Sequence, residues 1–279
     1  MKRLLPLVLA LVMTAGCGQP QETEAPVANA APEAAAPSQN QAAASETAVS
    51  ETAASEAAAV AEAAPAGAQD EPIELAQVDL SSVEALGFIE GRHYRRLSPT
   101  QATSSSPDQV EVTEFFMYVC PHCYNIEPYV EAWLEDKPDY INFVRTPTTW
   151  NQPPVPLHAQ AFYTAATLGK IDEMHMPFFQ EYHVNGNALE TPDKLAEFFG
   201  RFGVNREEFE STFESFIVNT RLRQAAQAGE RYRVGSTPTF IVNGKYTLDL
   251  STASYGLDAA SPERMFELIE ALAAAEVGR

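Results

Sequence analysis

Two cysteines three positions apart, Cys120 and Cys123, are the residues whose type and spacing most clearly indicate chemistry. A thiol at the start of a helix faces unpaired N–H groups and a partial positive charge, so it ionises more readily than a free thiol. Cys120 is therefore predicted to be a nucleophile, with Pro121 in the first helical turn and His122 adding a donor beside the sulfur. Cys123, one turn further on and more buried, is predicted to resolve a mixed disulfide formed at Cys120.

Cysteines at this spacing also occur in three other kinds of site. A c-type haem attachment is excluded because Tyr124, not histidine, follows Cys123. A zinc site needs about four ligands, but the one remaining cysteine is Cys17 and the histidines show no metal-binding spacing. A structural disulfide across so short a loop would remove little entropy from the unfolded chain. A redox pair without metal or organic cofactor is therefore favoured over a zinc site and a structural disulfide.

The segments around this pair alternate between strand and helix patterns. Residues 110–119 are mostly β-branched and aromatic and contain no Gly or Pro, which predicts a buried strand. Helical periodicity then continues to about residue 137, where Pro138 ends it. Residues 140–146 form a second predicted strand. From 147 to 232 the signals are helical, so a helical block follows the second strand.

Capping residues divide the helical block. Thr191 before Pro192, and Asn205 with Glu208, are signals of helix starts. The aromatic residues of the block recur at helical spacing, which predicts core positions rather than cofactor contacts. The main ones are Phe162, Phe198, Phe199, Phe209, Phe213 and Phe216.

The carboxyl-terminal third returns to strands. Asn243 and Gly244 stand between the apolar runs 239–242 and 245–248, which is a strong hairpin signal. Ser261 before Pro262 then predicts the start of a last helix. The order strand, redox helix, strand, helical block, hairpin and helix predicts a fold of the α/β class.

The first 17 residues have the pattern of a secretory signal peptide. Lys2 and Arg3 precede an apolar run that is too short to span a membrane stably. The small residues before Cys17 resemble the lipobox of bacterial lipoproteins, in which this cysteine is lipidated, although Thr14 stands where that motif prefers Leu or Val. The alternative is an ordinary secretory signal cleaved nearby. Both interpretations predict an exported protein.

Residues 18–90 differ in composition from the rest of the chain. They contain thirteen Asp or Glu, no Lys or Arg, and runs of Ala, Ser, Thr, Gln and Pro. Such a stretch buries too little apolar surface to offset its ordering entropy, so a disordered acidic tether is predicted. One folded domain is expected from about residue 91 to 275. The net charge of −20 argues against nucleic acid as a partner.

In combination, three motifs resemble the DsbA family of periplasmic thiol:disulfide oxidoreductases. They are Glu114-Phe115-Phe116, Cys120-Pro121-His122-Cys123-Tyr124 and Val242-Asn243-Gly244-Lys245-Tyr246. The resemblance covers about residues 91–275. It implies a thioredoxin fold with a helical domain inserted at about 150–230, and an enzyme that donates its disulfide to reduced exported proteins. It also implies a DsbB-like membrane protein that re-oxidises the enzyme.

The resemblance also implies roles for residues outside the cysteine motif. Pro238 is expected to be a cis proline facing the disulfide, with the backbone of Thr237 pairing with an extended substrate segment. Well-known family members carry Val at the position of Thr237, whereas related isomerases and reductases also use Thr. Glu114 is expected to lie beneath the active site with Arg145 as its partner, either as a plain ion pair or as a proton-handling group. Glu127 matches a further family position or is a solvated surface charge.

The function predicted from the sequence is that of an exported protein-disulfide oxidase, anchored to a bacterial membrane through Cys17 and working as a monomer in the periplasm. Two alternatives remain open. One is a disulfide reductase or isomerase of thioredoxin fold, and the other is a tethered, non-catalytic binding protein.

Overall fold

The computed structural model describes residues 79–277. The predicted signal peptide, Cys17 and the predicted tether up to residue 78 lie outside the described residues. Five strands form one sheet in the order β1-β5-β4-β2-β3. Strands β2 and β3 are parallel, and the other neighbouring pairs are antiparallel. The strands are β1 (Arg95–Arg96), β2 (Val110–Phe116), β3 (Ile141–Pro147), β4 (Thr239–Val242) and β5 (Tyr246–Leu248).

Strand β2 is central, and all seven of its residues are buried because both faces of the sheet are covered. Val110 and Val112 pack with α1 (Ser81–Ala85), α2 (Pro121–Asp136) and α9 (Pro262–Ala274). Phe115 points to the opposite face, where it packs with Tyr232 at the end of α7 (Phe216–Arg231). The strand ends at Phe116 rather than at residue 119 as predicted. Residues 117–119 instead form the turn that leads into α2.

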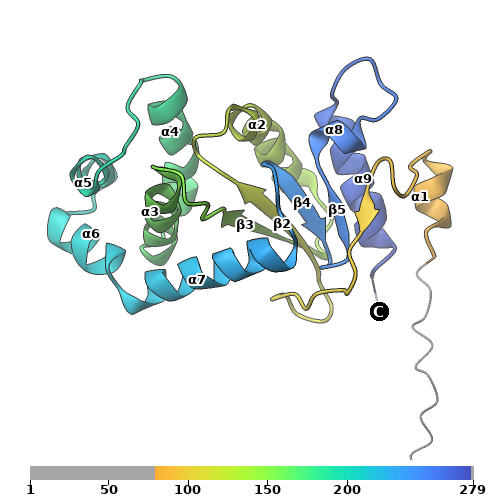
Figure 1. Ribbon diagram of the computed structural model, residues 1–279, viewed down its shortest axis with the longest axis horizontal. Helices are drawn as coiled ribbons and strands as arrows, with labels where there is room; N and C mark the ends of the chain where they lie inside the picture. The colour runs from red at the N-terminus through yellow and green to blue at the C-terminus, as the bar shows by residue number, and fades with distance from the viewer. Residues whose placement is uncertain (1–78, 278–279) are drawn as a thin grey trace, which may run out of the picture. The chain divides into compact units, whose positions relative to one another are not determined.

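The helical block predicted between residues 147 and 232 is confirmed. It comprises α3 (Val155–Thr167), α4 (Ile171–His183), α5 (Pro192–Gly200), α6 (Arg206–Phe213) and α7. In Figure 1, α3 to α6 lie to one side of the sheet, and α7 runs back from them toward β4. Thr191 and Asn205 cap α5 and α6 as predicted, each accepting a hydrogen bond from a backbone N–H three residues later.

Phe216 is a correction to the predicted aromatic core. Phe209 and Phe213 are buried, whereas the side chain of Phe216 is 79% exposed. The helical spacing does not continue because α6 ends at Phe213 and Ser215 caps a new helix, accepting a hydrogen bond from the Val218 N–H. Phe216 is the first residue of that new helix, so it no longer shares a face with the two buried phenylalanines.

The predicted hairpin between β4 and β5 is also confirmed. Asn243 and Gly244 both have positive φ, 50° and 62°, as a tight two-residue turn requires. A side chain at Gly244 would collide with the backbone carbonyl of Gln101, whose N–H donates to the Gly244 carbonyl at 3.0 Å. The last helix, α9, begins at the predicted Ser261–Pro262 signal, and the Ser261 hydroxyl accepts a hydrogen bond from the Arg264 N–H.

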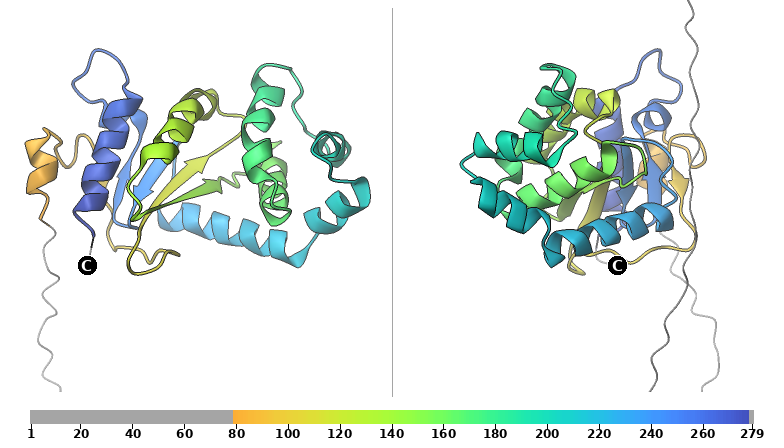
Figure 2. Two further views of the ribbon diagram at one scale, coloured as in Figure 1. Left: turned by 180° about the vertical axis from the view of Figure 1, so that it is seen from behind. Right: turned by 60° about the vertical axis from the view of Figure 1, so that its left-hand side comes forward.

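The boundary of the folded domain lies earlier than predicted. Val83 in α1 and Phe88 are fully buried in the same apolar cluster as α9, although the sequence places both in the tether. Arg264 of α9 covers the ring of Phe88 at 3.8 Å from the ring centre and donates to the carbonyl of Leu86. These few large apolar residues are enough to fold the segment onto the domain because α9 supplies the surface against which they pack. Figure 2 shows α1 beside α9.

Within residues 79–277, no group of three or more His, Cys, Asp or Glu side chains is placed to hold a metal ion. None of the helices in that range has the length and hydropathy needed to cross a bilayer.

Candidate active site

Cys120 is the N-cap of α2, and Pro121 is the first residue of the helix. Both cysteines are free thiols in this structure. Cys120 is 7% exposed and Cys123 is fully buried, so Cys120 is the more accessible of the two cysteines. This difference in access agrees with the order of attack expected from the sequence.

The environment of Cys120 lowers the pKa of its thiol to about 5. The largest cause is a hydrogen bond from the Cys123 thiol, and burial acts in the opposite direction. The Thr237 side chain and the backbone N–H groups of Cys123 and His122 also favour the thiolate. The helix start therefore contributes as expected, but it ranks below the second cysteine. The His122 side chain is exposed, and its backbone N–H is the group that lowers the pKa.

The peptide bond between Thr237 and Pro238 is cis, as the family resemblance implied. The Cys120 Sγ lies 3.4 Å from the Thr237 carbonyl oxygen, to which the thiol donates. The hydroxyl of Thr237 is buried and has no hydrogen-bond partner among the described residues. It is therefore free to donate to the sulfur once Cys120 is a thiolate, which no longer has a proton to give to the carbonyl.

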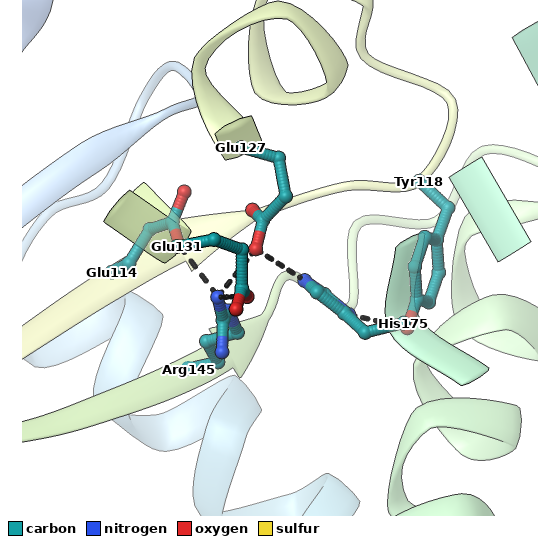
Figure 3. Close-up of polar contacts among 6 residues, drawn as sticks. All are labelled: Glu114, Tyr118, Glu127, Glu131, Arg145 and His175. Atoms are coloured by element: carbon teal, nitrogen blue, oxygen red, sulfur yellow. Dashed lines mark hydrogen bonds and ion pairs between the residues drawn. The ribbon is translucent and has the colours of Figure 1, made fainter. Parts of the chain in front are cut away.

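Beneath the cysteines, Arg145 is surrounded by three carboxylates (Figure 3). Glu114 and Arg145 are paired in register on the parallel strands β2 and β3, with Oε2 and Nε 3.9 Å apart. The Arg145 Nη2 donates to Glu127 and, at 2.5 Å, to Glu131. Glu127 is 1% exposed, which corrects the alternative of a solvated surface charge. It is buried because the face of α2 that carries Glu127 packs against the sheet and α4.

The two buried carboxylates differ in protonation. Glu114 has neither oxygen in a hydrogen bond, and burial together with the charge of Glu127 raises its pKa to about 8, despite Arg145. Burial also acts to raise the pKa of Glu127, but the nearby His175 and Arg145 outweigh burial and hold that pKa below its ordinary value. At neutral pH, Glu127 is therefore ionised and Glu114 is mostly protonated.

His175 of α4 joins this cluster from the helical insertion (Figure 3). Its Nε2 lies 3.3 Å from Glu127 Oε1, and its Nδ1 lies 2.8 Å from the Tyr118 hydroxyl. Burial lowers the pKa of His175, so the neutral ring is favoured. The 2.8 Å contact fits Nδ1 accepting from the Tyr118 hydroxyl, which leaves the proton on Nε2, the nitrogen nearer to Glu127, although Nε2 makes no hydrogen bond within the described residues. His175 thus connects the helical insertion to the buried cluster around Arg145.

The comparisons with known proteins agree with this geometry. The DSBA-like thioredoxin domain family matches residues 155–267. Thiol:disulfide interchange protein DsbA of Pseudomonas aeruginosa is 33% identical over 195 residues, covering 68% of this chain and 87% of the relative. The protein of the same name from Pseudomonas syringae pv. tomato is 35% identical over 192 residues, covering 68% and 86%. The crystal structure of Pseudomonas aeruginosa DsbA matches with a TM-score of 0.62 at 34% identity, covering 68% of this chain and 95% of that chain.

The chain belongs to the DsbA family. It has the thioredoxin fold with a helical insertion and is a thiol:disulfide oxidoreductase that acts in oxidative protein folding.

The DsbA fold brings the sequence-predicted site residues into two neighbouring groups. Cys120, Cys123 and Thr237 form the sulfur centre, with His122 and Pro238 beside them. Glu114, Glu127 and Arg145 form the buried cluster below it. The charge of Glu114 contributes to raising the pKa of Cys123, so the two groups are electrostatically connected.

Sequence reasoning missed His175 and Tyr118 as members of this DsbA site. It found no metal-binding spacing among the histidines, gave His175 no role, and placed Tyr118 inside the predicted strand 110–119. A usable signal existed, since His175 lies one helical turn before the buried Phe178 and Phe179 and so on the apolar face of its helix. Its partner on α2 could not be identified, because the two helices are almost 50 residues apart in the chain.

Replacing Glu114 with glutamine is expected to stabilise the protein at alkaline pH. The folded state holds the Glu114 proton up to about pH 8, whereas the unfolded chain releases it near 4.5, so raising the pH between these values lowers the free energy of unfolding. The glutamine variant lacks this loss. Its free energy of unfolding should therefore exceed that of the wild type by on the order of a few kcal/mol at pH 8, and by less near pH 4.5. Urea denaturation at several pH values measures the difference. An equal gain at all pH values would contradict a raised pKa.

Proposed function

We propose that this DsbA-family protein is an exported dithiol oxidase that donates a Cys120–Cys123 disulfide to reduced proteins in the periplasm. The observation that carries this direction of electron flow is the stabilised thiolate of Cys120. Whatever favours the ionised thiol favours the reduced enzyme, so the oxidised enzyme gives up its disulfide readily. The three groups that favour this anion, namely the Cys123 thiol, the Thr237 side chain and the start of α2, all converge on one sulfur.

The exchange proceeds in two displacements. A substrate thiolate attacks the Cys120 Sγ, the bond between Cys120 and Cys123 breaks, and Cys123 leaves with the electron pair. Because burial raises the pKa of Cys123 well above its ordinary value, this leaving thiolate takes up a proton. The second substrate thiolate then attacks the substrate sulfur of the mixed disulfide. Cys120 leaves as a stable thiolate, and the substrate retains the new disulfide.

Glu114 is the proposed proton source for Cys123. It is fully buried, and its carboxyl group is mostly protonated at neutral pH because burial raises its pKa to about 8. When Cys123 becomes an anion, its negative charge is stabilised by a proton held nearby. Arg145 and Glu127 position this carboxyl and set its charge environment. Thr237, beside the cis Pro238, is proposed to pair with the extended substrate segment through its backbone.

The remaining parts of the proposal concern the cellular setting. Residues 1–17 are proposed to direct export, and Cys17 to carry the lipid that anchors the protein to a bacterial membrane. A DsbB-like membrane protein is proposed to accept the electrons and restore the disulfide, with no further cofactor. The enzyme is proposed to work as a monomer on reduced exported proteins. The sequence patterns and the family resemblance support these points.

The reduction potential tests the direction of exchange. Equilibration with glutathione buffers is expected to give a value more positive than about −200 mV, whereas thioredoxin, a reductant, has about −270 mV. The physical reason is the low pKa of Cys120, which stabilises the dithiol form. A value near that of thioredoxin would favour the reductase alternative, which the threonine before Pro238 keeps open.

A further inference from the structure

A cleft of about 480 Å³ opens beside the loop that carries the cis proline. Its walls come from the edge strand β1 and the segment before it, from β5 and the start of α8 (Leu250–Ala253), and from residues 232–236. Four arginines line it, and Asp249 is the one acidic residue among its lining residues. The arginines are Arg92, Arg95, Arg96 and Arg233. In a chain with 18 basic and 38 acidic residues, this is a strong local concentration of positive charge.

Two of the four arginines are without a partner within the part of the chain that the structure describes. The Arg92 guanidinium lies 5.6 Å from the centre of the Tyr255 ring. Arg96 pairs with Glu90 at 3.1 Å. Asp249 caps α8, where it accepts a hydrogen bond from the Thr252 N–H at 2.8 Å. The guanidinium groups of Arg95 and Arg233 are exposed and, within residues 79–277, take part in no ion pair or hydrogen bond. The cleft therefore presents donors and charge to an anionic ligand.

The backbone at Arg233 adds an independent observation. This residue follows the end of α7 with a φ of 54°, a left-handed conformation in which glycine or asparagine would be less strained. Helix termination alone would be better served by glycine. An arginine therefore occupies a lining position of the cleft that glycine would fill with less strain, which is consistent with a use for the side chain.

The cleft borders the loop that contacts the Cys120 sulfur. Ser236 lines it, and the carbonyl of the following residue, Thr237, is 3.4 Å from the Cys120 sulfur. A polypeptide that pairs with Thr237 while it delivers a thiol to Cys120 would run close to Ser236, so we expect its neighbouring residues to reach the mouth of the cleft. We infer that the cleft binds acidic side chains flanking the reactive cysteine of the substrate, and so gives the enzyme a preference for acidic segments. This inference rests on the proposed function and defines its substrate class.

The shape of the site favours a polypeptide over a membrane surface. A bilayer presents its anionic headgroups on a nearly flat plane, whereas these arginines line a concave site. An extended chain can place single carboxylates inside it. Arginine also forms paired hydrogen bonds with a carboxylate, which adds geometric selectivity to the charge attraction.

The test compares two peptides that differ only in charge. Each contains two cysteines, and one cysteine is flanked on both sides by three aspartates in the first peptide and by three asparagines in the second. At low salt, the oxidised wild type is expected to oxidise the aspartate peptide roughly five- to tenfold faster, and added salt should reduce the difference. The Arg95→Gln/Arg233→Gln variant is expected to lose this preference while oxidising the asparagine peptide at the wild-type rate.

A matched control removes the same charge elsewhere. Arg206 and Arg223 are exposed on the helical insertion, so an Arg206→Gln/Arg223→Gln variant should keep the preference. If the wild type oxidises both peptides equally, or if the preference survives the cleft substitutions, the inference is wrong. Arginine-dependent sedimentation with phosphatidylglycerol vesicles without any peptide preference would likewise overturn it in favour of a lipid.

A binding measurement separates this inference from the proposed function. Fluorescence anisotropy with labelled peptides whose cysteines are replaced by serine reports on the cleft without any redox step. Tighter binding of the aspartate peptide, lost in the Arg95→Gln/Arg233→Gln variant, supports the cleft even if the protein fails to oxidise dithiothreitol. Failure with dithiothreitol would count against the oxidase alone, whereas equal binding of both peptides would count against the cleft alone.

Discussion

Replacing Cys120 with serine is expected to lower the rate at which the protein oxidises a reduced substrate by on the order of 10³-fold or more. Cys120 is the more accessible cysteine of the pair and carries the sulfur that the substrate thiolate attacks, and its pKa of about 5 makes it a good leaving group. Serine has the same shape but does not ionise at neutral pH and cannot form a disulfide. Oxidative refolding of a reduced, disulfide-containing protein measures the loss.

The Cys123→Ser variant distinguishes the roles of the two cysteines. With Cys17 also changed to serine and oxidised glutathione present, Cys120 in this variant should attack the disulfide, release one glutathione thiolate and keep the other glutathione. The Cys120→Ser variant should gain none, because Cys123 is fully buried and its pKa is well above the ordinary value. Mass spectrometry of the intact proteins measures the addition. Equal labelling of both variants would contradict the assignment of Cys120 as the nucleophile.

Replacing Arg145 with methionine is expected to reduce the free energy of unfolding by about 3–5 kcal/mol at neutral pH, the range seen when one member of a buried ion pair is removed. Arg145 is the cation that contacts Glu114, Glu127 and Glu131, and the first two of these carboxylates are almost completely buried. Methionine keeps much of the length of the side chain but leaves Glu127 without its guanidinium partner. Urea denaturation of the wild type and the variant gives the difference.

Two further variants show whether charge or packing causes the loss. Arg206→Met removes an arginine from an exposed pair of carboxylates and should change stability by no more than about 1 kcal/mol. Adding Glu127→Gln to Arg145→Met removes the uncompensated buried charge and should restore part of the stability. No recovery in this double variant would show that the methylene packing of Arg145, rather than its charge, carries the effect.

Local features of the sequence are sufficient to predict the redox centre and several element boundaries. The cysteine pair follows a strand and begins a helix because both the strand pattern and Pro121 act over a few neighbouring residues. The same is true of the turn at Asn243–Gly244, where left-handed backbone angles favour these residue types. The capping residues Thr191 and Ser261 likewise act within one helical turn.

The errors, and the alternatives that the sequence left open, occur where the outcome depends on what packs against a segment. Glu127 has the same neighbours in sequence whether it is solvated or buried, and only the approach of Arg145 and α4 decides that it is buried. In the sequence, Phe216 follows the helical spacing of Phe209 and Phe213, but in the structure it is exposed because Ser215 starts a new helix. Phe88 belongs to the folded domain only because α9 covers it.

The sequence by itself therefore determines the reaction, since the nucleophile, the resolving thiol and the helix start lie within four consecutive residues. Only the tertiary structure decides how that reaction is supported. It joins Glu114 of β2, Arg145 of β3, Glu127 of α2 and His175 of α4 into one buried cluster, and it gathers four arginines from two distant segments into one cleft. The physical reason is that burial and charge contacts depend on distances in space. Residues far apart in the chain come within reach only when the core has formed.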